Sequence, residues 1–93
     1  MALTFGWDSR KAVQNLKKHG VPFIEAATVF SDPLSASFDD PDHSVEEHRF
    51  ITVGLSSRGK LLVVSHTDRG KSIGLISARK ATKHEREYYE EKK

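Results

Sequence analysis

The stretch RFITVGLSSRGKLLVVSHTDRGKSIGLISA, residues 49–78, decides the fold of this 93-residue chain. It contains three runs rich in β-branched and apolar residues, at 49–56, 60–67 and 72–78. The short connections 57–59 and 68–70 separate these runs, and each ends in a glycine that can take the positive φ of a tight turn. Because connections this short join antiparallel neighbours, the stretch predicts a three-stranded meander. Residues 61–64 are apolar at successive positions, which predicts a central strand covered on both faces.

The segment before the meander predicts a first strand and two helices. Residues 3–7 alternate in the manner of a strand, and Asp8 is a suitable N-cap for a helix that ends at His19 and Gly20. Pro22 suits the first turn of a second helix. The apolar stripe of that helix predicts a core contact and comprises Phe23, Ala26, Ala27 and Phe30. The two helices are expected to form a helical hairpin.

The remaining elements complete an α+β domain. Residues 31–33 end the second helix, residues 34–38 are a candidate short strand, and residues 39–43 predict a polar loop. Thr82 and Glu85 have capping-box spacing for a terminal helix over residues 83–91, whose apolar face is thin. The expected architecture is a single domain, residues 1–93, with helices packed on a mainly antiparallel sheet.

Composition narrows the classes of function. The net charge is +2, since 15 Lys and Arg nearly balance 13 Asp and Glu, so the overall charge is a weak indication of nucleic-acid binding. The charges are uneven, however, because residues 10–19 carry five basic side chains and no acid, whereas residues 39–47 carry five acids. Cysteine is absent, and no apolar run is long enough to span a bilayer. We therefore expect a cytoplasmic protein without disulfides.

The sequence contains no convincing motif for binding a metal or a nucleotide. His43 and His48 lie near Asp42, Glu46 and Glu47, but acidic loop residues of this kind are usually solvated. There is no glycine-rich phosphate loop and no signature of a catalytic nucleophile. We expect neither a metal nor a cofactor.

Two adjacent cations predict an anion site near the end of the chain. Arg79 and Lys80 follow the last strand-like run and precede the terminal helix. Because the two cations repel each other, they add little to the stability of the fold, whereas a phosphate would be a natural neighbour for both. Other basic side chains that could contribute to RNA binding are Lys11 and Lys18, on the polar face of the first helix.

The chain contains the types of residue that RNA cleavage without a metal requires. Such cleavage needs a base for the 2′-hydroxyl, an acid for the leaving 5′-oxygen and cations for the charge on phosphorus. His66 and Glu47 are the candidates for proton transfer. Arg49, Arg69 and Arg79 offer planar forks of donors that suit a phosphate.

Each candidate also has a structural interpretation. His66 alternates with Leu62 and Val64, so it is either a catalytic residue or a hydrogen-bonded core histidine. Arg69 is either a phosphate ligand or a solvated turn residue, and Trp7 is either a core residue or a platform for a base. Whether His66 and Arg79 share a face depends on the strand register.

Motifs spread over most of the chain resemble the BrnT family of bacterial type II toxins. The matching motifs are Phe5-x-Trp7-Asp8, Asn15-Leu16-x-Lys18-His19-Gly20-Val21-x-Phe23-x-Glu25-Ala26, Asp32-Pro33, Glu47-x-Arg49-Phe50-Ile51-x-Val53-Gly54, His66-Thr67-x-Arg69 and Ile76-Ser77-Ala78-Arg79-Lys80-Ala81.

This resemblance implies a RelE-like fold and a metal-independent ribonuclease that arrests translation. It further implies neutralisation by a BrnA-type antitoxin, through which alone the toxin would reach operator DNA. Lys18, Glu47, Arg49, His66, Arg69 and Arg79 match positions that the family tends to keep polar. The alternative is a binding module without catalysis, in which the basic helix and Arg79 complement an acidic protein or DNA.

Overall fold

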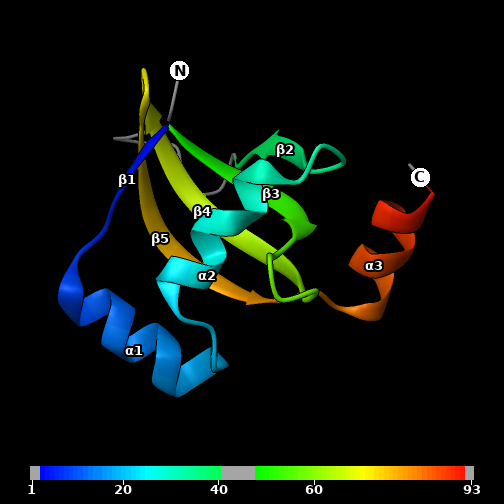
Figure 1. Ribbon diagram of the computed structural model, residues 1–93, viewed down its shortest axis with the longest axis horizontal. Coiled ribbons are helices and arrows are strands. Elements are labelled where there is room, and N and C mark those ends of the chain that lie inside the picture. Colours follow the sequence, from blue (N-terminus) through cyan, green and yellow to red (C-terminus); the bar gives the residue numbers. More distant parts are fainter. Residues whose placement is uncertain (1–2, 41–47, 92–93) are drawn as a thin grey trace.

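The fold is built on one five-stranded sheet in the order β1-β5-β4-β3-β2 (Figure 1). The structure is a computed structural model that describes residues 3–40 and 48–91. The strands are β1 (Thr4–Gly6), β2 (Ala36–Asp39), β3 (Arg49–Leu55), β4 (Leu61–Arg69) and β5 (Ser72–Lys80). Neighbouring pairs are antiparallel except β1 and β5, which run parallel. The mainly antiparallel sheet with helices confirms the α+β prediction.

The predicted meander is present as β3, β4 and β5, with one of its turns shorter than expected. The first turn has Gly59 at φ 78°, as predicted. At the second turn, Asp68 and Arg69 still pair with Ile73 and Ser72, so β4 continues through Arg69. The prediction of a turn at residues 68–70 was therefore wrong in its extent. A two-residue connection remains, in which Gly70 takes φ 65°.

The register assigns each side chain to one of two faces, because paired residues in a sheet point the same way. We call one face the α2 face. It presents Leu62, Val64 and Ala78 to a buried core that also includes Val21, Phe23, Ala26, Val29, Ile73 and Leu75. We call the other the α3 face, where Val53, Leu61 and Val63 pack with Tyr89.

The second predicted helix is two shorter elements. α1 (Ser9–His19) begins with the Asp8 carboxylate accepting hydrogen bonds from two backbone N–H groups, and it ends at Gly20. α2 spans Phe23–Ala27, and a 3-10 helix, η1 (Thr28–Ser31), follows it. The expected continuous helix was therefore wrong. Thr28 Oγ1 donates to the Glu25 carbonyl at 2.6 Å, a local bond that competes with regular helix geometry.

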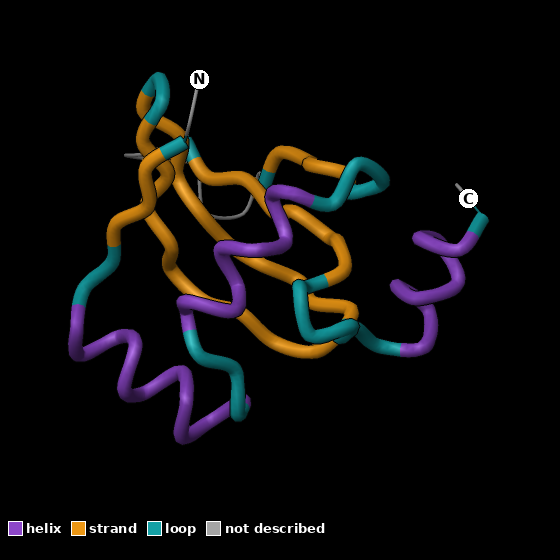
Figure 2. The backbone as a smooth tube through the Cα atoms, in the orientation of Figure 1, coloured by secondary structure: helices purple, strands orange, loops and turns teal. Residues whose placement is uncertain are grey.

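The expected helical hairpin is not confirmed. α1 lies beside the edge of β5, whereas α2 and η1 cross the α2 face (Figure 2). Asn15 fixes α1 to that edge, because its side-chain amide donates to the Ala78 carbonyl at 2.8 Å and accepts from the Ala78 N–H at 3.0 Å. A second bond from the same amide to the Val21 carbonyl fixes the loop after α1.

The terminal helix α3 (Lys83–Glu90) packs on the α3 face. Its capping box between Thr82 and Glu85 is present, as predicted. The Tyr89 hydroxyl donates to Asp32 Oδ2 at 2.6 Å, and this bond raises the pKa of Tyr89 to about 12. Tyr89 therefore holds α3 against the sheet. None of the helices in the described part of the chain is long and apolar enough to cross a membrane.

Candidate nucleic-acid interface

The α3 face carries successive rows of side chains across the strands. The row nearest the start of β3 comprises Gly6, Gly74, Thr67 and Arg49. The second row comprises Ser77, Ser65 and Ile51. The third comprises Arg79, Val63 and Val53, and it lies against α3. Two arginines therefore share one face, with hydroxyl side chains between them.

Arg79 is bound by a carboxylate of the protein itself. Its two terminal nitrogens each donate to an oxygen of Glu85 at 2.8 Å, a bidentate pair. The Arg79 hydrogen bond lowers the pKa of Glu85 to about 2, and the Glu85 bond raises the pKa of Arg79. The protein's own carboxylate thus occupies the guanidinium fork of Arg79, and the anion site there stays a prediction.

Lys80 does not share that site. Lys80 pairs with Leu62, whose side chain lies on the α2 face, whereas Arg79 pairs with Val63 on the α3 face. The expectation that one phosphate would lie beside both cations was therefore wrong. Arg79 and Lys80 are the last two residues of β5, and neighbours in a strand point in opposite directions.

The other predicted phosphate ligands also lie on the α3 face. Arg49 is half-buried and stands two rows from Arg79, roughly 13 Å along the strand direction. Arg69 pairs with Ser72 beyond the first row and is exposed. Glu47, the carboxylate candidate for proton transfer, lies outside the described residues.

His66 is a hydrogen-bonded core residue on the opposite face. It is 1% exposed, and its ring lies edge-on to Phe30 at 4.8 Å. Nδ1 lies 2.7 Å from Asp68 Oδ1, and Nε2 lies 2.7 Å from Thr52 Oγ1. Burial lowers the pKa of His66, although Asp68 acts in the opposite direction. The structure does not bring His66 together with Arg49 and Arg79.

Sequence reasoning did not find the partners of His66. Asp68 lies two residues after His66 on the same strand face, and that spacing was a visible signal. Thr52 becomes a neighbour through the β3–β4 register, in which Phe50 stands opposite His66. A β-bulge between Ser65 and His66 places His66 opposite Leu75, and no residue pattern indicated this bulge.

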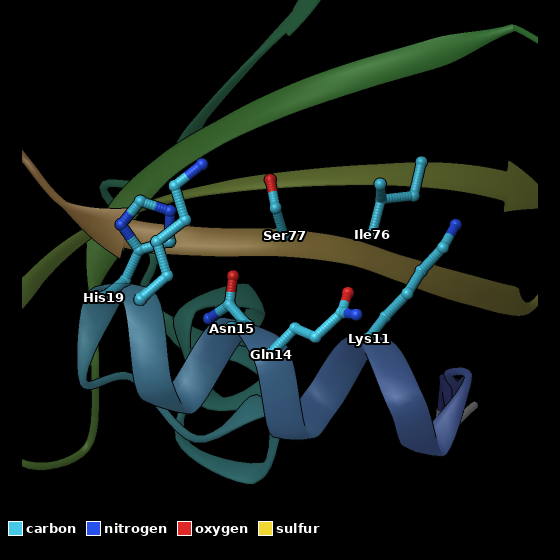
Figure 3. A pocket seen from close by; sticks show the side chains of 7 residues that line it. Lys11, Gln14, Asn15, His19, Ile76 and Ser77 are labelled. Carbon is cyan, nitrogen blue, oxygen red and sulfur yellow. The ribbon is translucent and has the colours of Figure 1, made fainter.

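A cleft between α1 and β5 brings the basic helix to the second row (Figure 3). Its volume is about 240 Å³. Side chains from α1 point towards the strand across it, and the residues that line it are Lys11, Gln14, Asn15, Lys18, His19, Ile76 and Ser77. Ser77 belongs both to this cleft and to the second row, so the two predicted lysines border the arginine-bearing face. His19 was not predicted as a site residue.

A second cavity of about 430 Å³ lies where β1 ends. Trp7, Arg69, Thr67 and the two glycines of the first row are among the residues that line it. Sequence reasoning considered Trp7 and Arg69 separately but could not place them together. Within residues 3–40 and 48–91, no group of three or more His, Asp or Glu side chains is placed to hold a metal ion.

The family model that matches the chain is that of the ribonuclease toxin BrnT, of type II toxin–antitoxin systems, over residues 7–85. The chain belongs to the BrnT family. No curated protein matches the chain. A solved structure that is similar is the crystal structure of the Brucella abortus ribonuclease toxin BrnT, with a TM-score of 0.68 and 21% identity. The match covers 88% of this chain and 100% of that one.

The BrnT match covers the α1 cleft and strands β2 to β5. The range 7–85 runs from Trp7 at the second cavity to Glu85, the partner of Arg79. The solved BrnT structure supports the fold at 21% identity, and the RelE-like classification stays a prediction. A BrnT protein of a type II system implies an antitoxin partner.

Proposed function

We propose that this BrnT-family protein is a metal-independent RNA endonuclease that inhibits translation, with its RNA bound on the α3 face. The observation that carries the proposal is the register, which gives one face both Arg49 and Arg79. Arginine forks stabilise the charge that builds on a phosphate during transfer, and they remain charged at all relevant pH values.

The cleft beside α1 extends this surface. Lys11 and Lys18 line it and would bind phosphates next to those held by the arginines. Lysine suits this role because phosphate contacts set position and affinity without reading the bases. Lys80, on the α2 face, does not join this set.

Proton transfer falls to Glu47 in this proposal, and only the sequence supports that assignment. Glu47 precedes Arg49 by two residues, so a carboxylate and a phosphate ligand lie close along the chain. Deprotonation of the 2′-hydroxyl by Glu47 lets it attack phosphorus, which forms a 2′,3′-cyclic phosphate as the bond to the 5′-oxygen breaks, and water protonates the departing 5′-oxygen. His66 is buried on the other face beside Thr52 and Asp68, and it has no role in proton transfer in this proposal.

The partner of the toxin is proposed to be a BrnA-type antitoxin, and operator DNA would be reached only through it. The family description of a type II system supports an antitoxin partner. Overexpression alone should arrest growth, and co-expression of the neighbouring gene product should relieve the arrest. If growth were unaffected by the soluble protein, the toxin proposal would fail.

Cleavage of purified single-stranded RNA in EDTA tests the enzymatic proposal. The wild type should cut, Arg79→Ala should lose at least about a hundredfold in rate, and Arg86→Ala should cut normally. Arg86 is the matched control, since it is an exposed arginine on α3. Thermal unfolding establishes that each variant is folded. Normal cutting by Arg79→Ala would refute the site, and RNA binding without cutting would favour the non-catalytic module.

A further inference from the structure

We propose that the cavity beside Trp7 is a nucleobase-binding pocket, which takes one unpaired base of a single-stranded RNA. We call it the Trp7 pocket. The proposal deepens the proposed function and rests on it for the choice of RNA as the polymer. A flat aromatic ring would lie over a floor of backbone, against the indole of Trp7.

The floor of the Trp7 pocket is made by two glycines side by side. Gly6 on β1 and Gly74 on β5 are partners in the parallel register, in the same row as Thr67 and Arg49. Glycine inside a strand weakens the strand and often marks a place where a ligand approaches the backbone closely. A Cβ at Gly74 would lie 2.7 Å from Thr67 Oγ1, so packing explains that glycine.

Packing does not explain Gly6. A Cβ built there meets nothing within 4 Å, and its φ is not positive. A Cβ could therefore stand at this position without a clash, yet the sheet has bare backbone there. A planar ligand that rests on the backbone accounts for the missing side chain.

Trp7 forms a wall that is held in place but remains accessible. Trp7 is 42% exposed, and its ring packs edge-on against Phe23 at 5.9 Å and 78°. Phe23 is 2% exposed and belongs to the core, so the indole is anchored from one side. Single-stranded RNA is recognised largely by stacking of unpaired bases on aromatic side chains.

The size and polarity of the Trp7 pocket suit a base with its sugar. Its volume of about 430 Å³ falls within the roughly 300–1,000 Å³ typical of small-ligand sites. Asp8, Thr67 and Ser72 line it and offer hydrogen-bonding groups to the edge of a base. Arg49 ends the same row two strands from Gly74, roughly 10 Å away. A base in the pocket would therefore place a neighbouring phosphate near Arg49.

Intrinsic fluorescence tests the proposal directly, because Trp7 is the single tryptophan of the chain. The probe is a fully 2′-O-methylated oligonucleotide, which lacks the attacking hydroxyl and stays intact. Saturable quenching of Trp7 is expected with this probe and little or none with an abasic strand of the same length. Equal quenching by both strands, or binding without quenching, would overturn the pocket, as would a failure of the methylated strand to bind.

Gly6→Ala adds a methyl group to the floor without a clash. We expect affinity for the methylated oligonucleotide to fall about tenfold, a loss in the range of one base stack, with affinity for the abasic strand unchanged. The unfolding temperature should not fall, because alanine restricts the unfolded chain more than glycine does. Unchanged affinity for both strands would overturn the proposal.

The outcomes separate this inference from the proposed function. If the wild type cleaved RNA but Trp7 were not quenched, the pocket proposal would be refuted and the endonuclease proposal would stand. If quenching depended on the base but unmodified RNA were not cleaved, the pocket proposal would stand and the endonuclease proposal would be refuted.

Discussion

Glu85 both caps the terminal helix and joins it to the sheet. Its carboxylate accepts from the Thr82 backbone N–H at 2.8 Å and pairs with both terminal nitrogens of Arg79. An RNA phosphate at Arg79 would compete with this carboxylate, since a guanidinium has one such fork to offer along that edge. The cap and the proposed phosphate site therefore depend on the same side chain.

The Arg79–Glu85 pair predicts a specific dependence of stability on pH. The pKa of Glu85 is about 2 in the folded protein, against 4.5 unperturbed, so the unfolded chain takes up the proton more readily. The stabilisation is complete above about pH 4.5 and is lost as the pH falls towards 2. Glu85→Gln, which can keep the capping box, should weaken this dependence in urea unfolding between neutral pH and about pH 3. Glu87→Gln is the control, and identical curves for Glu85→Gln and the wild type would contradict the prediction.

His66 predicts a loss of stability on the acidic side of neutrality. Burial lowers its pKa below 6.5, so the unfolded chain binds the proton more tightly, and stability falls as the pH drops below about 6.5. His66→Ala should cost about 3 kcal/mol in the free energy of unfolding, because it leaves a cavity and removes a partner from Thr52. Any loss of RNA cleavage by His66→Ala should be proportional to the fraction of the variant that is unfolded. If His66→Ala were fully folded but did not cleave RNA, His66 would have a catalytic role after all.

Among the elements, the sequence predicted those that depend on local signals and missed those that depend on register. The β3–β5 meander, the Asp8 cap and the Thr82–Glu85 capping box follow from nearby residues, and all are present. The face of Arg79 and the burial of His66 depend on pairing across strands and on one bulge. Residue spacing alone carries no information on either, so the sequence could suggest a set of candidate site residues but not their arrangement.

The contact between η1 and β3 predicts which glycine of the sheet tolerates a side chain. A Cβ at Gly54 would lie 2.7 Å from Val29 Cγ1 and 2.9 Å from Ser35 Cβ. Gly54→Ala should therefore separate η1 from β3 and cost about 1–3 kcal/mol in the free energy of unfolding. Gly6→Ala serves as the matched control. Equal stability of the two variants in urea would show that η1 packs elsewhere.

For the whole molecule, the uneven distribution of charge matters more than its small net value. RNA affinity should fall steeply with salt, with a slope of about 0.7 in log–log terms for each phosphate neutralised on a single strand. Lys18→Gln should reduce that slope by about one phosphate. Lys60→Gln should leave it unchanged, because Lys60 lies in the β3–β4 turn, at the end of the sheet opposite Arg49. Equal slopes for the two variants, measured by titration at several salt concentrations, would exclude the α1 cleft from the interface.

The bonds between Asn15 and Ala78 have a consequence for how the sheet is protected. β1 covers β5 through Gly74, and beyond it the Asn15 amide occupies the place of a neighbouring strand. The Ala78 amide should therefore exchange its hydrogen for deuterium slowly, although its acceptor is a side chain. Asn15→Leu should speed that exchange and expose a strand edge on which other chains could pair. One side-chain amide thus protects the molecule against edge-to-edge aggregation.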